Sequence, residues 1–179
     1  MRILRGIALL IAATLLLTAC RSVGPEAYAA ETPTLDLYQY FQGKTDAWGY
    51  FADRSGRVVR RFTVAIEGTV RGNDLVLDER FTYSDGTTSQ RVWTIRRVDA
   101  HSYTGTAGDV IGTARGSAYG NALQWAYVLA LEVDNRTYEV TFDDWMYLVD
   151  EHVMLNRATM RKFGIRLGEV TLSFHKPSP

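Results

Sequence analysis

Apolar and polar residues alternate with a period of two along most of this chain, from Leu35 to Lys176, and this pattern restricts the fold more than any other feature. In one such segment, single polar residues separate Tyr138, Val140 and Phe142. Short groups of Gly, Asp and Asn interrupt the alternation and are typical of turns. Because a strand places every second side chain on the same face, the pattern predicts a series of antiparallel strands, each buried on one face only.

About eight to ten short strands joined by tight turns form an up-and-down meander, and closing it into a barrel removes exposed edges. We therefore expect an all-β fold, a closed antiparallel up-and-down barrel, with a β-sandwich as the alternative. Only Leu155 to Gly164 also has a spacing compatible with a helix. Phe41-Gln42-Gly43 followed by Trp48-Gly49 resembles, at a longer spacing, the Gly and Trp signature that plugs one end of lipocalin barrels. The expected barrel is thus lipocalin-like (calycin).

The first twenty residues have the pattern of a cleavable lipoprotein signal. Arg2 and Arg5 precede an uncharged apolar run that ends in Leu17-Thr18-Ala19-Cys20. This pattern resembles the lipobox of bacterial lipoproteins, and the run is too short to span a membrane. We expect a signal peptide over residues 1–19, a lipidated N-terminus and flexible linker over 20–34, and a single β-barrel domain over 35–179. Arg21 favours an address at the outer membrane, facing the periplasm.

Composition excludes several classes of function. Cleavage before Cys20 would remove two of the 20 Lys and Arg residues and none of the 20 Asp and Glu residues, leaving a net charge of −2. This balance argues against nucleic acid as a partner. A single cysteine permits neither a disulfide framework nor a thiolate metal site, and the three histidines match no metal-ligand spacing. We expect no cofactor, and no catalytic motif is recognisable.

Polar residues on the apolar face of the strands are the candidate functional groups. The period of two directs five polar side chains inward, beside the aromatic residues of the same face. These five are Arg60, Glu79, Arg91, Asn121 and Asp144. The candidate ligand-binding residues are Arg60, Glu79, Arg91, Trp93, Asn121, Trp125, Tyr127 and Asp144. A hairpin at Ser84-Asp85-Gly86 places Glu79 opposite Arg91 or one pair away, which predicts an inward ion pair. The following hairpin sets Asp144 opposite Tyr127, which predicts a hydrogen bond between carboxylate and phenol.

These groups allow more than one interpretation. They can hold the polar head of an amphipathic ligand whose tail occupies the barrel, or they can pair with one another in a barrel filled by side chains. An accessory protein that docks on an envelope enzyme through Trp145 and Tyr147 is a further possibility. An enzyme that uses Asp144, Glu79 or Asp109 as an acid or base is another, and a raised carboxylate pKa inside an open cavity would favour it.

Several segments together resemble a family of Gram-negative lipoproteins, the domain of unknown function 3833. They are Ala47-Trp48-Gly49, Arg60-Arg61-Phe62, Asp78-Glu79-Arg80-Phe81, Gly108-Asp109-Val110-Ile111-Gly112, Gly120-Asn121-Ala122-Leu123 and Phe142-Asp143-Asp144-Trp145-Met146-Tyr147, besides the lipobox. The resemblance covers nearly the whole mature chain and supplies no catalytic residues. Because such lipoproteins are often encoded near enzymes that modify membrane fatty acids, it implies a fatty acid or another lipid as the ligand.

Overall fold

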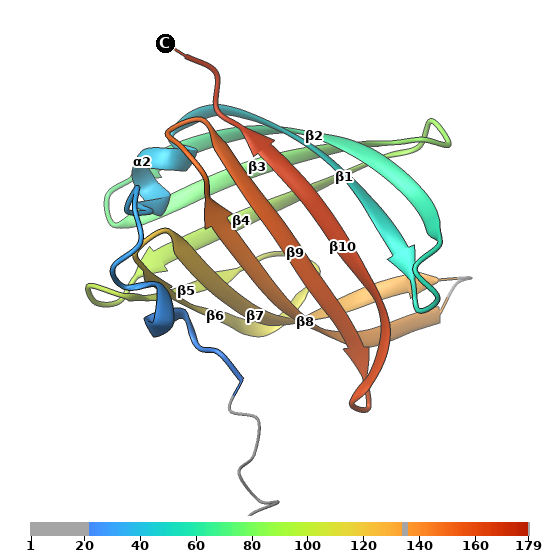
Figure 1. Cartoon of the computed structure of the whole chain (residues 1–179). Coiled ribbons are helices and arrows are strands. Elements are labelled where there is room, and N and C mark those ends of the chain that lie inside the picture. Colours follow the sequence, from blue (N-terminus) through green and yellow to red (C-terminus); the bar gives the residue numbers. More distant parts are fainter. Residues whose placement is uncertain (1–21, 134–135, 179) are drawn as a thin grey trace, which may run out of the picture.

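A computed structural model describes residues 22–133 and 136–178, and its main feature is a closed barrel of ten antiparallel strands (Figure 1). Each strand pairs with its neighbours in the sequence, and β1 closes the barrel by pairing with β10. The strands are β1 (Gly43–Asp53), β2 (Val58–Arg71), β3 (Asp74–Tyr83), β4 (Thr88–Arg97), β5 (Ser102–Thr106), β6 (Val110–Tyr119), β7 (Ala122–Val133), β8 (Arg136–Leu148), β9 (Val153–Lys162) and β10 (Ile165–His175).

The predicted up-and-down, lipocalin-like barrel is therefore confirmed, and the β-sandwich alternative is wrong. The helical alternative for Leu155 to Gly164 is also wrong, because Val153–Lys162 is strand β9, paired with β8 and β10 along its length. Its side chains alternate between buried and exposed in the order that a strand requires. The weak helical spacing carried no information there.

A short helix that the alternation did not reveal, α2 (Leu37–Phe41), plugs one end of the barrel (Figure 1). Asp36 caps it, since its carboxylate accepts hydrogen bonds from the backbone N–H groups of Tyr38 and Gln39. The buried Phe41 ring packs edge-on against Phe174, at 5.7 Å between ring centroids. We call this the closed end; the turns β2–β3, β4–β5, β6–β7 and β8–β9 lie around it.

The sequence predicted that Trp48 plugs one end of the barrel, but Phe41 does so instead. Trp48 is 51% exposed and lies on the outside of the barrel, whereas Phe41 fills the closed end. Gly68 on β2 makes this possible, because a Cβ there would overlap the carbonyl group of Phe41. The structural role predicted for the Gly43 and Trp48 pair is therefore carried by Phe41 and Gly68.

The segment that precedes the barrel was expected to be a flexible linker, but part of it packs against the barrel. A 3-10 turn, η1 (Pro25–Tyr28), packs beside β6 and β7, and Pro25 is buried. The N–H of Leu35 donates a hydrogen bond to the carbonyl of Gly120 in the β6–β7 turn. Residues 1–21, with the predicted signal peptide and Cys20, lie outside the described residues. No helix in the described part of the chain is long and apolar enough to cross a membrane.

Candidate ligand-binding cavity

The barrel encloses a cavity of about 400 Å³ that runs from Phe41 at the closed end to the opposite rim. At the rim it is bordered by Arg60, Tyr83, Glu132 and Val133, of which the last two are exposed, so the cavity opens to solvent there. The interior is therefore not filled by side chains, and the interpretation as a solid barrel does not hold. We call this open end the mouth.

The cavity lining forms three layers along the barrel axis, and β3 illustrates them. Its inward residues run from Leu77 near the closed end through Glu79 to Phe81 and Tyr83 near the mouth. The floor is apolar and includes Ile66, Trp93, Ile95, Leu123, Trp125 and Phe174. Halfway along lies a polar belt formed by Glu79, Arg91, Tyr127, Asp144 and Asn156. Above it the lining becomes apolar again, with Phe51, Phe62, Phe81, Phe142, Met160 and Val170.

Glu79 pairs with Arg91 in the β3–β4 register, as predicted, but their side chains form no ion pair. The Arg91 guanidinium instead binds the carboxylate of Asp109, in the β5–β6 turn, with Nε at 3.0 Å from both oxygens and Nη2 at 2.8 Å from Oδ2. The fork of the guanidinium suits this bidentate contact. The predicted ion pair of Arg91 with Glu79 was therefore wrong. No local sequence pattern indicates that Asp109, in a turn, reaches Arg91.

Within the described residues, the Glu79 carboxylate forms neither a hydrogen bond nor an ion pair, and it lines the cavity. Burial raises the pKa of Glu79 to about 7; the charge of Arg91 opposes this rise, and those of Asp109 and Asp144 add to it. Burial would lower the pKa of Arg91, but its hydrogen bond with Asp109 and the charge of Glu79 keep it above its usual value.

Asp144 is held by two neighbours in the belt. Its Oδ2 accepts a hydrogen bond from the Tyr127 hydroxyl at 3.1 Å, and its Oδ1 accepts one from Nδ2 of Asn156 at 3.2 Å. Burial raises the pKa of Asp144 to about 6, although both hydrogen bonds act to lower it. Burial, together with the charge of Asp144, also raises the pKa of Tyr127 well above its usual value. Asn156 also belongs to the belt, although it was not among the residues predicted from the sequence.

The predicted contact between Tyr127 and Asp144 is confirmed, but the register behind it was wrong by one pair. Asp144 lies opposite Trp125, and Tyr127 lies opposite Phe142. The phenol reaches the carboxylate diagonally, which long side chains on neighbouring antiparallel strands can do. The contact was therefore predicted correctly although the length of the hairpin was not, because both side chains still point to the same face.

Two other predicted residues lie outside the belt. Arg60 is at the mouth, where Nη2 contacts Asp85 at 2.9 Å and the guanidinium carbon lies 3.6 Å from the Tyr83 ring centroid. Asn121 does not line the cavity; its Nδ2 donates to the Leu148 carbonyl at 3.1 Å near the closed end. Asn121 precedes the first residue of β7, where the alternation that predicted an inward direction no longer applies.

Both predicted tryptophans line the cavity floor. Trp93 packs edge-on against Trp125 and Tyr127, with ring centroids 5.7 and 5.4 Å away. The Trp125 ring lies over Gly105 on β5 and Gly116 on β6, where any Cβ would overlap it. Aromatic rings therefore connect the floor of the cavity directly to the polar belt.

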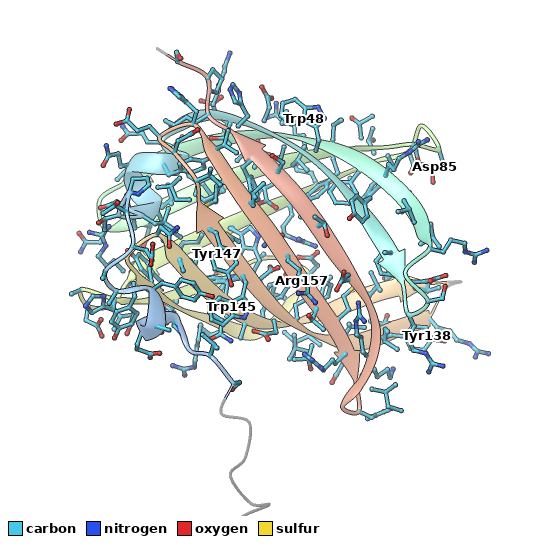
Figure 2. All side chains as sticks on the ribbon, viewed as in Figure 1. Trp48, Asp85, Tyr138, Trp145, Tyr147 and Arg157 are labelled. Carbon is cyan, nitrogen blue, oxygen red and sulfur yellow. The ribbon has the colours of Figure 1, made fainter. Side chains whose placement is uncertain are left out.

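Trp145 and Tyr147, proposed as an exposed docking surface, lie together on the outer face of β8 (Figure 2). The chain's own Tyr28 packs edge-on against both rings, at 6.1 and 5.3 Å between centroids. Tyr28 lies in η1, so these two rings already hold the N-terminal segment. Neither of them is free to the extent that the docking hypothesis assumed.

The described residues contain neither a metal-binding cluster nor a pair of adjacent carboxylates that converge on one point. Among residues 22–133 and 136–178, no group of three or more metal-ligating side chains could hold a metal ion. The adjacent carboxylates Asp143 and Asp144 diverge, as expected on a strand. Asp143 accepts a hydrogen bond from Gln124 at 2.8 Å, while Asp144 faces the cavity.

Comparison with known proteins identifies one matching family model and several similar structures. The model, described as "Protein of unknown function (DUF3833)", matches residues 14–176. The S-type phycobiliprotein lyase CPES from Guillardia theta superimposes with a TM-score of 0.58 at 5% identity, covering 79% of this chain and 92% of the lyase. A DUF3598 protein of unknown function from Nostoc punctiforme gives 0.57 at 12% identity, covering 83% and 51%. No curated protein matches the sequence. At these identities the structural likeness concerns the fold alone.

Proposed function

Because the chain belongs to DUF3833, a family of proteins of unknown function, we propose its function from the cavity: it binds one small amphipathic molecule inside the barrel. A cavity of about 400 Å³ carries this proposal. Its volume lies within the roughly 300–1,000 Å³ of small-molecule sites, and a mostly apolar lining with a few convergent polar groups is typical of such sites. A single-chain lipid, with a fatty acid among the candidates, has the matching elongated shape and amphipathic character.

Native mass spectrometry of the full chain, incubated with an envelope lipid extract, tests this proposal. Ala158 lines the cavity from β9, and Ala158→Phe would fill part of it. Ala65→Phe adds the same bulk to the exposed face of β2 and is the matched control. We expect the wild type and Ala65→Phe to retain a lipid that Ala158→Phe releases while keeping its circular dichroism spectrum. Retention of the same lipid by all three proteins would place the site elsewhere.

We also propose that Cys20 carries a lipid anchor and that the protein faces the periplasm from the outer membrane. Ser22 is the first described residue, and two residues of chain reach at most about 7 Å. η1 lies beside the β6–β7 turn at the closed end, since a Cβ on Gly120 would overlap the Tyr28 carbonyl. An anchor so close to η1 would hold the closed end nearer the bilayer and turn the mouth away from it.

Metabolic labelling with palmitate, followed by separation of inner and outer membranes, tests this anchoring. We expect label in the outer-membrane fraction for the wild type and none for Cys20→Ala. If the wild type is unlabelled or sediments with the inner membrane, the proposed address is wrong. Access of a bulky thiol reagent to Ser55→Cys at the mouth and to Asn73→Cys at the closed end, in the anchored protein, then reports which end faces away from the bilayer.

A second candidate function is acid–base catalysis on the bound molecule. One observation favours it: Glu79 faces the cavity without a partner in the described residues, and burial raises its pKa to about 7, a value suited to proton transfer near neutral pH. Extracted lipid incubated with the wild type and with Glu79→Gln would then differ in composition. Identical lipid masses from both incubations would leave binding as the function.

A further inference from the structure

We propose that the polar belt selects an amphiphile whose polar group is a cationic amine, in preference to a carboxylate or a phosphate. This inference rests on the proposed function and specifies the head group of the ligand. It starts from the charges that face the cavity and from a carboxylate that has no partner in the described residues.

The cationic groups of the cavity lining are already neutralised. Arg91 is held bidentately by Asp109, and Arg60 at the mouth contacts Asp85. Glu79 and Asp144 have no cationic side chain within ion-pair distance in the described residues. The belt therefore contains two carboxylates in excess, in an interior where charges interact more strongly than in water. An anionic head group would add a further negative charge, whereas an ammonium group would compensate for one.

Besides the remaining N–H groups of Arg91, the belt offers unused acceptors on its two carboxylates. The Tyr127 hydroxyl and the Asn156 amide donate to Asp144, and Nε and Nη2 of Arg91 donate to Asp109. Glu79 accepts no hydrogen bond from the described residues, and carboxylate oxygens can each accept more than one. An ammonium group carries up to three donors and no acceptor, so it matches the unused capacity of Glu79 and Asp144.

Aromatic rings surround the belt and add to the same preference. Trp93 and Tyr127 pack edge-on at 5.4 Å, and Phe81 lies next along β3 from Glu79 on the inward face. The faces of such rings attract cations, and aromatic cages are a known setting for bound ammonium groups. A cation bound here would also favour the ionised form of Glu79, whose pKa burial raises to about 7.

Native mass spectrometry of the full chain with equal amounts of dodecylamine and dodecanoic acid at pH 7.5 tests this head-group preference. We expect the amine complex to exceed the acid complex by about tenfold or more, as a charge-assisted hydrogen bond would give. Glu79→Gln removes the unpartnered charge while keeping the side-chain shape. It should lower the amine preference by about tenfold without weakening binding of the acid.

Glu67→Gln is the matched control, because Glu67 is an exposed residue on the outer face of β2 and its substitution changes the net charge equally. Glu67→Gln should keep the wild-type preference. If neither amphiphile binds the wild type, the proposed function itself fails. If the acid binds as well as the amine, or if Glu79→Gln and Glu67→Gln behave alike, the head-group inference is overturned while lipid binding stands.

Discussion

The Tyr127 hydroxyl lies 3.1 Å from Oδ2 of Asp144, although Tyr127 is one pair out of register with it. Tyr127 stacks on its true partner, Phe142, with 5.0 Å between ring centroids and an interplanar angle of 7°. The phenol therefore reaches diagonally from β7 to the carboxylate on β8. Because Asn156 binds the other oxygen of Asp144, one carboxylate connects β7, β8 and β9 at the level of the belt.

Tyr127→Phe should raise the pKa of Asp144 further above its present value of about 6, because the hydroxyl hydrogen bond stabilises the ionised carboxylate. The free energy of unfolding should fall by about 1 kcal/mol, which is typical for the loss of one hydrogen bond. Carboxyl carbon NMR titration measures the first effect, and urea denaturation measures the second. Tyr50→Phe, on a residue 38% exposed, is the control and should change neither.

Glu79→Gln should reduce the pH dependence of stability between pH 5 and pH 8. Glu79 has a pKa of about 7 in the folded protein against its usual 4.5, so the folded state holds more protons than the unfolded state between these values. The stability that Glu79 contributes is therefore fully present below pH 4.5 and is lost as the pH rises through 7. The loss amounts to about 3 kcal/mol. Urea denaturation at several pH values measures it.

The glutamine variant should consequently be more stable than the wild type at pH 8 and closer to it at pH 5. Asp144, with a pKa of about 6, also makes the protein less stable as the pH rises, and this smaller effect remains in the variant. Glu67→Gln again serves as the control and should follow the wild-type curve. Parallel curves for the wild type and Glu79→Gln would mean that Glu79 is ionised in the folded protein at little cost.

Arg91→Met should destabilise the barrel by about 2 kcal/mol, because Asp109 loses its bidentate partner and the belt loses its cation. The side chain of Arg91 is 21% exposed and that of Asp109 is 38% exposed, so solvent replaces only part of the lost contact. The pair Arg157 and Glu169 on the outer surface offers a comparison, since Arg157 is 66% exposed (Figure 2). Arg157→Met should cost less than about 1 kcal/mol. Equal losses in urea denaturation would show that Arg91 acts as a surface residue.

Much of the barrel could be predicted from alternation alone, because the period of two fixes both the strands and the direction of each side chain. This is why Glu79, Arg91 and Asp144 were placed inside correctly while their partners were less certain. An error of one same-face pair in a hairpin does not change which side chains point inward, but it does change which side chains are expected to touch. Asn121 is an exception, because the alternation of side-chain direction does not extend to the residue just before a strand begins.

The remaining features depend on contacts between distant parts of the chain. Asp109 reaches Arg91 from a turn, and Phe41 plugs the barrel from a helix too short to show a period. Pro25 and Tyr28 lie in a segment whose composition is typical of a linker, yet they pack on the barrel. Each of these contacts involves a single side chain, so no repeating sequence pattern predicts it. A three-dimensional structure is needed to find them.

Tyr28→Ala should release η1 from the barrel, because Tyr28 supplies the ring that packs against Trp145 and Tyr147. We expect faster amide hydrogen exchange over residues 22–35 and a loss of about 1–3 kcal/mol, since each of the two aromatic pairs is typically worth about 0.5–1.5 kcal/mol. Val23→Ala, on a residue 59% exposed, should leave exchange unchanged. Fast exchange of this segment in the wild type would instead support the flexible linker expected from composition.

Gly116→Ala should shorten the cavity, because Gly116 supports the Trp125 ring that forms its floor. A Cβ on Gly116 would overlap the indole, which lies over the inward face of β6, so the added methyl group would push the ring toward the cavity. The overlap should lower the free energy of unfolding by about 1–3 kcal/mol, as overpacking does. The displaced ring should exclude longer acyl chains before shorter ones.

Native mass spectrometry with a series of amphiphiles of increasing chain length measures the depth of the cavity in this variant. Gly108→Ala is the control, because no atom lies within 4 Å of the Cβ it would add. The wild type and Gly108→Ala should retain the same longest chain, and Gly116→Ala should retain only shorter ones. If all three retain chains of equal length, Trp125 does not form the floor, and the bound chain must run toward the mouth instead.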